Sequence, residues 1–247
     1  MLAQLPTADP DPLWDLAREY LQDSRPEKMD LIVGVYRDEA GRTPVMRAVS
    51  VAESELSSRA PSKTYRGLSG NLHFIDGISR FLFGAGSSVL DRQCTIQTVG
   101  GTGALRLLAE FIAGVTPLST VWVSNPGYVN HQPILAAAGI AVREFRWREN
   151  ERGLDLDAAL ADLGQARPGD VLLIHGCCHN PSGIDPDPSQ WRALSARCHQ
   201  QEMIPFIDMA YQGFGRGVDE DAEGLRIMAA EHDCLLVAAS CSKNMGL

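Results

Sequence analysis

The chain has 247 residues, with 22 lysines and arginines against 31 aspartates and glutamates, and hence a formal net charge of −9. A chain of this length builds one large or two modest domains and buries a sizeable core without metal or disulfide cross-links. The acidic balance excludes a general nucleic-acid or anionic-membrane surface, since both need clustered positive charge. Arginine dominates the basic residues, because the only lysines are Lys28, Lys63 and Lys243.

The N-terminal sequence has no basic start followed by an apolar stretch, so we expect no secretory signal. No apolar run approaches the roughly 20 residues of a membrane helix. Six cysteines in a chain of this size do not indicate a disulfide framework. The adjacent Cys177 and Cys178 would face opposite sides of a strand. We therefore expect a cytoplasmic protein with free thiols.

The N-terminal third is predicted to hold a few separate elements. Apolar spacing and turn residues there predict a helix over 12–22, a short strand over 31–36, a turn over 38–41, a helix over 45–56 that Pro44 opens, and a helix over 75–83.

From Cys94 onward short apolar runs alternate regularly with amphipathic segments. The predicted strands cover 95–99, 121–124, 141–145, 171–175, 204–208 and 235–240. One predicted helix follows Gly103 and runs to Ala113, and the others cover 134–138, 156–163, 189–199 and 221–230. This alternation predicts an α/β fold with a mostly parallel sheet flanked by helices.

Ligands of such sheets bind at the carboxyl ends of the strands. The phrases that follow the predicted strands are Gly100-Gly-Thr-Gly103, Asn125-Pro-Gly-Tyr128, Asn180-Pro-Ser-Gly183, Asp208-Met-Ala-Tyr211 and Ser240-Cys-Ser-Lys243. Together they offer backbone N–H donors, a carboxylate, a phenol and an amine. We expect this edge of the sheet to carry the chemistry.

The glycines of 100–103 are compatible with two structures, a tight strand-to-helix turn and a backbone site for an anion at a helix N-terminus. A dinucleotide site needs a third glycine, but that position is Arg106. It also needs an acidic residue roughly 20 positions on, and none occurs between Glu110 and Glu144. The sequence therefore disfavours a nicotinamide oxidoreductase.

The phrase His175-Gly-Cys-Cys-His179 contains residue types that bind zinc. It lies at a strand end and runs directly into an Asn-Pro turn. We therefore favour buried residues that pack behind a site, and we expect no metal.

Two further residues have both a structural and a functional interpretation. Asp208 ends an apolar strand, and a buried carboxylate needs a partner: it is either a helix N-cap or a counter-ion for a cationic heterocycle or metal. Tyr211, three residues on, could reach the same ligand. Lys243 is either a solvated surface group or the site of amine chemistry, since arginine cannot form a Schiff base.

Three of these phrases, Asn180-Pro-Ser-Gly183, Asp208-Met-Ala-Tyr211-Gln-Gly-Phe and Ser240-Cys-Ser-Lys243-Asn, resemble the signatures of class I aminotransferases that use pyridoxal 5'-phosphate. The longer phrases Gly34-Val-Tyr-Arg-Asp-Glu, His175-Gly-Cys-Cys-His-Asn-Pro and Ala210-Tyr-Gln-Gly-Phe-Gly-Arg-Gly resemble the aspartate and aromatic amino-acid aminotransferases in particular. The resemblance runs from about Asp9 to the last residue.

The resemblance implies roles around the ring of the cofactor. Lys243 would bond to the cofactor and then move the substrate proton. Asp208 would pair with the pyridine nitrogen and keep it protonated, with His131 behind that carboxylate. Tyr211 and Asn180 would hydrogen-bond the phenolic oxygen.

The resemblance also implies roles around the phosphate and between subunits. The backbone of Gly101 and Thr102, together with Ser240, would hold the phosphate. Tyr65 would reach the phosphate of a neighbouring subunit's cofactor, which implies a homodimer.

The substrates implied are an amino acid and a 2-oxo acid. Gly34, Tyr128 and Asn180 would contact the substrate. The amino group of an acidic or aromatic amino acid would pass to 2-oxoglutarate by a ping-pong path. The family usually has tryptophan where this chain has Tyr128, and a tyrosine stacks on the cofactor with less area.

The family fold is the type I fold of pyridoxal-phosphate transferases. Residues 1–44 would form an amino-terminal arm and part of a small domain, and residues 45–247 a large cofactor-binding domain that is incomplete at its C-terminus. The family's later arginines, which bind the substrate carboxylates, have no counterpart by motif here. Two alternatives follow: a non-catalytic truncated fragment of such an enzyme, and another pyridoxal-phosphate reaction such as decarboxylation or β-elimination.

Overall fold

The computed structural model describes residues 12–30, 32, 37–65, 67–148 and 153–246. The chain divides into two compact units, Met1–Ser50 and Val51–Leu247. The strand predicted over 31–36 falls almost entirely outside the described residues, and Gly34 lies outside them.

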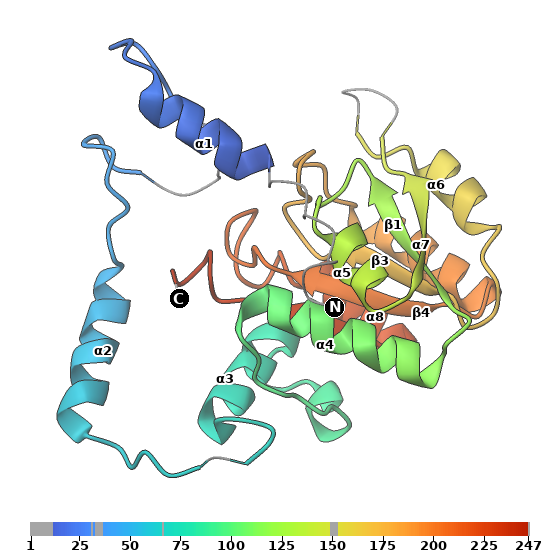
Figure 1. Cartoon of the computed structure of the whole chain (residues 1–247). Helices are drawn as coiled ribbons and strands as arrows, with labels where there is room; N and C mark the ends of the chain where they lie inside the picture. The colour runs from blue at the N-terminus through green and yellow to red at the C-terminus, as the bar shows by residue number, and fades with distance from the viewer. Residues whose placement is uncertain (1–11, 31, 33–36, 66, 149–152, 247) are drawn as a thin grey trace, which may run out of the picture. The chain divides into compact units, whose positions relative to one another are not determined.

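The first unit contains helix α1 (Pro12–Gln22), as predicted (Figure 1). The Nζ atom of Lys28 donates to the carbonyl oxygens of Tyr20 (2.8 Å) and Asp23 (2.6 Å) just beyond this helix. A cation there compensates the unsatisfied carbonyls and the negative end of the helix dipole. The predicted turn follows, and its Asp38 carboxylate accepts the N–H groups of Ala40 and Arg42.

Helix α2 (Arg47–Arg59) crosses in sequence from the first unit to the second. The later elements, in chain order, are α3 (Leu72–Phe83), the short 3-10 helix η2 (Ser88–Asp91), α4 (Gly100–Val115), β1 (Thr120–Asn125), α5 (His131–Ala137), β2 (Ala141–Arg146), α6 (Leu156–Leu163), β3 (Val171–His175), α7 (Pro188–Gln200), β4 (Ile204–Met209), α8 (Glu223–Glu231) and β5 (Leu236–Ala239). Strand and helix alternate from β1 onward, which confirms the α/β prediction.

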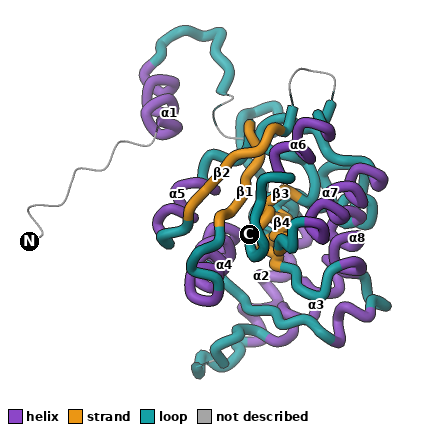
Figure 2. The backbone as a smooth tube through the Cα atoms, turned by 90° about the vertical axis from the view of Figure 1, so that its right-hand side faces the viewer, coloured by secondary structure: helices purple, strands orange, loops and turns teal. Residues whose placement is uncertain are grey.

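The strands form one sheet in the order β2-β1-β3-β4-β5, of which Figure 2 labels the first four. Every neighbouring pair of strands is parallel. After β1 the chain goes out to the edge strand β2 and then returns to the other side of β1 with β3. This reversal is a topological switch point, where open α/β sheets bind ligands. Every residue of β3 is buried, as expected of a central parallel strand covered on both faces.

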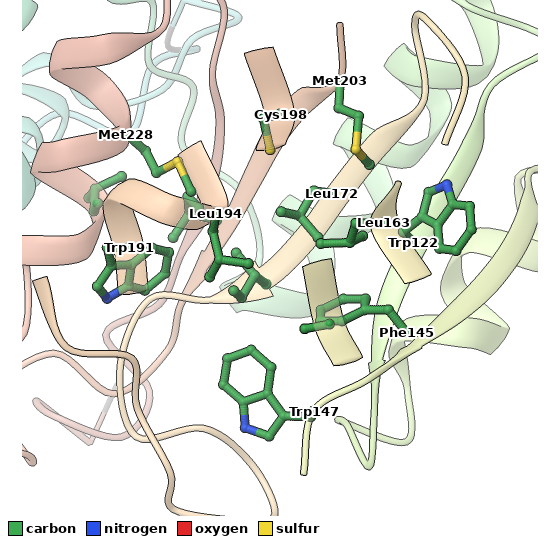
Figure 3. Close-up of a cluster of buried hydrophobic side chains, with 14 of the residues drawn as sticks. Trp122, Phe145, Trp147, Leu163, Leu172, Trp191, Leu194, Cys198, Met203 and Met228 are labelled. Atoms are coloured by element: carbon green, nitrogen blue, oxygen red, sulfur yellow. The ribbon is translucent and has the colours of Figure 1, made fainter. Parts of the chain in front are cut away.

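Alternate residues of β3 enter two separate cores. Leu172 and Ile174 belong to a core that α6, α7 and α8 cover, and Figure 3 shows part of it, including the indole rings of Trp122 and Trp191. Val171 and Leu173 face the opposite way, into a core that α4 and α5 cover. The sheet therefore lies between two helical layers, which leaves its carboxyl edge as the place for a site.

The strand predicted over 95–99 is wrong: these residues form no strand. A strand needs a hydrogen-bonded neighbour, and the backbone bond that joins this segment to a more distant part of the described chain runs from Gln97 N–H to the oxygen of Ser69 (2.8 Å), a loop residue. Several helices begin earlier than predicted. Helix α3 begins at Leu72, because the Asn71 side chain caps it by accepting from the N–H groups of His73 and Phe74.

Among the described residues, none of the helices combines the length and the apolar character that a membrane crossing demands.

Candidate functional site

A cavity opens at the carboxyl edge of the sheet in the second unit. The residues that line it are Val99, Gly100, Gly101, Thr102, Leu105, Tyr128, His175, Asn180, Asp208, Ala210, Tyr211, Ser240, Ser242 and Lys243. Each of the five strand-end phrases identified from the sequence contributes at least one of them. The topology thus brings together residues that are far apart in the chain.

The N-terminus of α4 forms one wall of this cavity. Gly100 opens the helix with a positive φ of 63°, and the first four-residue backbone bond there runs from Gly103 N–H to the Val99 oxygen. Gly101 and Thr102 precede that bond, and no side chain caps the helix. A Cβ added to Gly101 would lie 3.2 Å from Cβ of Ser240, so glycine keeps this cradle open. Free N–H groups, the helix dipole and the nearby Ser240 suit an anion such as phosphate.

A buried carboxylate lines the floor of the cavity, and a buried histidine lies directly behind it. His131 is the first residue of α5, and its Nε2 lies 2.9 Å from Oδ2 of Asp208, the fifth residue of β4. Both side chains are almost fully buried. The imidazole therefore supplies the partner that a buried carboxylate needs, and Asp208 makes this bond rather than capping a helix.

His175 lies beside this pair, since parallel pairing sets it opposite Asp208 on the neighbouring strand. Its ring centroid is 5.0 Å from that of His131. Burial above all lowers the pKa of His175 to about 3; His131, His179 and Lys243 act in the same direction and Asp208 opposes them. The ring is therefore neutral at physiological pH, and its Nδ1 is buried without a hydrogen-bond partner. The sequence assigned His175 to packing, although its place as the last residue of a strand was the signal for a cavity position.

Tyr211 lines the cavity together with Lys243 and Asn180, and both of these residues contact it. Burial, followed by Asp208 and Tyr128, raises the pKa of the Tyr211 phenol, so that it stays protonated and can donate. The Asn180 amide reaches the phenol oxygen at 3.4 Å. The exposed Lys243 places its Nζ 5.1 Å from the centre of the Tyr211 ring, within cation–π range. An amine, a phenol and an amide thus share one side of the cavity.

Tyr128 borders the cavity between β1 and α5. Its ring meets His131 edge-on, with centroids 5.2 Å apart and planes at 90°. Its hydroxyl accepts a hydrogen bond of 2.9 Å from the side chain of Asn130. Nothing in the sequence indicated this bond, since residues two apart seldom meet in a regular element.

His179 packs behind the cavity, as the sequence predicted for this phrase. Its two ring nitrogens lie 2.9 Å from Ser124 Oγ and 2.7 Å from Ser182 Oγ, and the ring stacks on Trp147 at 4.3 Å. Burial is the main reason that its pKa is lowered to about 4. The rings of His175 and His179 pack against each other edge-on, with centroids 4.7 Å apart, so the two histidines of the phrase are neighbours in the structure.

Two groups of described residues have potential metal-binding atoms within 4.8 Å of one another: His131, His175 and Asp208 in one, and Cys177, Cys178 and Asp221 in the other. In the first group His131 and Asp208 already bond to each other. In the second, the Asp221 carboxylate already accepts the backbone N–H groups of residues 213, 215 and 216. These contacts account for both carboxylates without an ion.

One predicted site residue is not brought to the cavity: Tyr65 is fully exposed and is absent from the cavity lining. Gly34 lies outside the described residues. The other predicted residues line the cavity, except His131, which lies directly behind Asp208.

The comparisons with known proteins agree with this arrangement. The family model described as "Aminotransferase class I and II" matches residues 26–247. The whole chain is 47% identical to the aspartate aminotransferase of Salmonella typhi and 42% identical to the aromatic-amino-acid aminotransferase of Paracoccus denitrificans, and covers 63% of each. The chain thus spans less than two thirds of the length of these relatives.

Solved structures show the same likeness. All of the chain superposes on 63% of an aromatic amino acid aminotransferase with 3-indolebutyric acid, with a TM-score of 0.96 and 42% identity. The same coverage and a TM-score of 0.96, at 33% identity, hold for the aromatic-amino-acid aminotransferase of Burkholderia pseudomallei, which is described as covalently bound to pyridoxal phosphate. With its fold, its strand-end motifs and the matched residues in agreement, the chain belongs to the class I and II aminotransferase family.

Proposed function

We propose that the protein is a pyridoxal-phosphate-dependent aminotransferase that passes the amino group of an acidic or aromatic amino acid to 2-oxoglutarate by a ping-pong path. The relatives named above support both substrate classes, since they are aspartate and aromatic-amino-acid aminotransferases. The described chain would be the part of the enzyme that holds the cofactor.

One observation carries this proposal: a carboxylate, a phenol, an amine and an anion cradle converge on one cavity. Pyridoxal phosphate has a matching set of groups, namely a basic pyridine nitrogen, a phenolic oxygen, an aldehyde and a phosphate. When bound, it supplies an electron sink for the carbanion that forms as the substrate loses a proton. The open cradle at Gly101 fits the phosphate, because a side chain there would crowd Ser240.

The buried carboxylate would set the electronics of the site. Asp208 would hold a proton on the pyridine nitrogen, which strengthens the electron sink. His131 orients the carboxylate through its 2.9 Å bond and leaves the other oxygen for the ligand. The lowered pKa keeps His175 neutral, so it adds no competing positive charge beside Asp208.

Tyr211 and Asn180 would bind the phenolic oxygen of the cofactor, and Lys243 would transfer the protons. Tyr211 stays protonated because its pKa is raised, so its hydroxyl can donate to an oxygen anion, with Asn180 beside it. The Lys243 amine would hold the cofactor by condensing with its aldehyde, with the aldehyde oxygen lost as water; once the substrate amine displaces it, Lys243 would carry the proton removed from the substrate. Its place over the Tyr211 ring holds the amine on the same side as these groups.

The remaining assignments concern the substrate and a second subunit. Gly34, Asn180 and Tyr128 would contact the substrate. Tyr65 would reach the phosphate of a second subunit, and its complete exposure in the single chain is compatible with such a partner. The enzyme would then be a cytoplasmic homodimer.

Titration of the 247-residue chain with pyridoxal phosphate tests the cofactor site. We expect saturable binding with an absorption band of the protein-bound cofactor, lost in Lys243→Ala and retained in Lys63→Ala. Lys63 is an exposed lysine outside the cavity lining and serves as the matched control. An unchanged spectrum in Lys243→Ala would overturn the lysine assignment, and an absence of binding would overturn the cofactor site.

A second measurement separates transamination from cofactor binding alone. The loaded chain is mixed with aspartate, glutamate or phenylalanine, and the released 2-oxo acid is measured in a single turnover. Release that requires Lys243 supports transamination by this chain. Cofactor binding without release supports a non-catalytic fragment, and release of carbon dioxide or ammonia instead supports decarboxylation or elimination.

A further inference from the structure

Asn130 is an exposed residue outside the cavity lining whose side chain is used in an unusual way. It lies at the position that precedes helix α5, where an asparagine ordinarily caps the helix by accepting a backbone N–H. Here it makes no side-chain cap bond. Its amide nitrogen donates instead to the hydroxyl of Tyr128, 2.9 Å away. The Asn130 side chain therefore contacts Tyr128, a cavity residue, instead of capping helix α5.

The backbone makes this contact possible. The segment between β1 and α5 turns so that the His131 N–H donates to the Tyr128 carbonyl oxygen at 3.0 Å. This turn brings the side chains of residues 128 and 130 together, which regular helix spacing does not do. The contact therefore depends on the turn and on a hydroxyl at position 128.

A continuous series of contacts leads from Asn130 to the floor of the cavity. The Tyr128 ring packs edge-on against His131, whose Nε2 bonds Asp208. The Tyr128 oxygen accepts from Asn130, so its own O–H is still available as a donor. Tyr128 also helps to raise the pKa of Tyr211, after burial and Asp208, which puts the two phenols within electrostatic reach.

From these contacts we infer that Asn130 is a positioning residue: its amide sets the ring and the hydroxyl of Tyr128 against the cavity floor and thereby strengthens the binding of pyridoxal phosphate. The inference rests on the proposed cofactor site and adds a residue outside the cavity to it. The hydrogen bond that the Asn130 side chain makes goes to Tyr128, so we expect its effect on the cavity to pass through that hydroxyl.

The first test measures the dissociation constant of pyridoxal phosphate and the induced circular dichroism of the bound cofactor. We expect Asn130→Ala and Asn130→Asp each to weaken binding by roughly three- to tenfold, the effect of one hydrogen bond. An aspartate has nearly the same shape but cannot donate, and it would draw the tyrosine O–H away from the cavity. The matched control is Gln132→Ala, because the Gln132 amide donates to Glu144 of strand β2 and not to Tyr128.

A double-mutant cycle separates this role from a general effect on α5. In the Tyr128→Phe background, Asn130→Ala should weaken binding no further, since the hydroxyl it orients is gone. Additive losses would overturn the inference, because Asn130 would then act by another route. Wild-type affinity in both Asn130 variants would overturn it as well.

A measurement without cofactor keeps the inference distinct from the proposed function. In the cofactor-free chain, Asn130→Ala should shift the nuclear magnetic resonance signals of the Tyr128 and His131 rings, and Gln132→Ala should not. Unshifted signals contradict the inference even if the cofactor binds. Shifted signals in a chain that fails to bind the cofactor contradict the proposed function and the claimed effect on binding, and leave the contact itself established.

Discussion

The imidazole of His131 and the carboxylate of Asp208, 77 residues apart in sequence, meet at 2.9 Å, and both side chains are almost fully buried. His131 is the first residue of helix α5, which connects β1 to β2, whereas Asp208 lies in strand β4. A carboxylate buried this deeply is tolerated because the imidazole is its partner. The pair ties the stability of the sheet edge to the chemistry of the cavity.

Removing the imidazole should therefore damage both properties. We expect His131→Ala to lower the free energy of unfolding by about 1–3 kcal/mol, because a buried carboxylate oxygen loses its partner. His131→Gln keeps an N–H donor and should recover part of the loss. Urea unfolding and titration with pyridoxal phosphate measure the two effects. Equal cofactor affinity in wild type and a folded His131→Ala variant would contradict the coupling.

The cradle at the start of α4 should be sensitive to a single methyl group. In Gly101→Ala the new Cβ would lie 3.2 Å from Cβ of Ser240, and one of the two must move. We expect cofactor and inorganic phosphate to bind about tenfold more weakly, as if one charge-assisted hydrogen bond were lost.

Gly103→Ala provides the comparison within the same helix. Its Cβ would make an ordinary contact of 3.5 Å with Cβ of Thr98. Its effect on phosphate affinity should be much smaller, and equal effects at both positions would argue against a phosphate at Gly101. Isothermal titration of each variant with inorganic phosphate measures the difference.

The buried histidines should make the protein less stable in mild acid. The pKa is lowered to about 3 for His175 and about 4 for His179, against 6.5 for an ordinary histidine. Below about pH 6.5 these histidines bind protons in the unfolded chain but stay neutral in the folded chain, so the free energy of unfolding falls as the pH falls. The contribution of His179 levels off below about pH 4 and that of His175 below about pH 3. Each histidine contributes a slope of at most about 1.4 kcal/mol per pH unit.

Urea unfolding at pH 7, 6 and 5 measures this slope. The double variant His175→Asn/His179→Asn removes both groups and should flatten the dependence. A slope as steep as that of the wild type would show that other groups cause the acid sensitivity.

A pair of helix glycines should respond in opposite directions to alanine. In Gly224→Ala the new Cβ would overlap the indole of the buried Trp191, and we expect a loss of about 1–3 kcal/mol. Gly114 in α4 has open space around it, so Gly114→Ala should gain about 0.5–1 kcal/mol from helix propensity. Thermal unfolding of both variants checks the prediction, and a stabilised Gly224→Ala variant would contradict the packing of α8 on α7.

Local pattern was sufficient where an element is long or wholly apolar. The bounds of β3 and α6 agree with those predicted from sequence, because one is an unbroken apolar run between turns and the other a regular helical repeat that Asp155 caps. The same reasoning failed over residues 95–99. An apolar and β-branched composition favours an extended chain, but it cannot supply the neighbouring strand that pairing needs.

The start of helix α5 was also predicted wrongly from the sequence. Helix α5 begins at His131, three residues before the predicted start, although Asn130 does not cap it. The reason is tertiary, since the His131 ring is drawn to Asp208 and the Tyr128 hydroxyl takes up the Asn130 amide. Neither contact leaves a trace in the local sequence pattern.

The sequence by itself determined which residues stand at the ends of the strands, because apolar runs and the polar phrases that follow them are local features. It therefore identified Asp208, Tyr211 and Lys243, with the glycines of α4, as one candidate set. Only the tertiary structure decided which of them meet: the strand order sets His175 beside Asp208 and carries His131 to the same carboxylate. The physical reason is that contacts between parallel strands depend on crossover connections, whose order no local periodicity encodes.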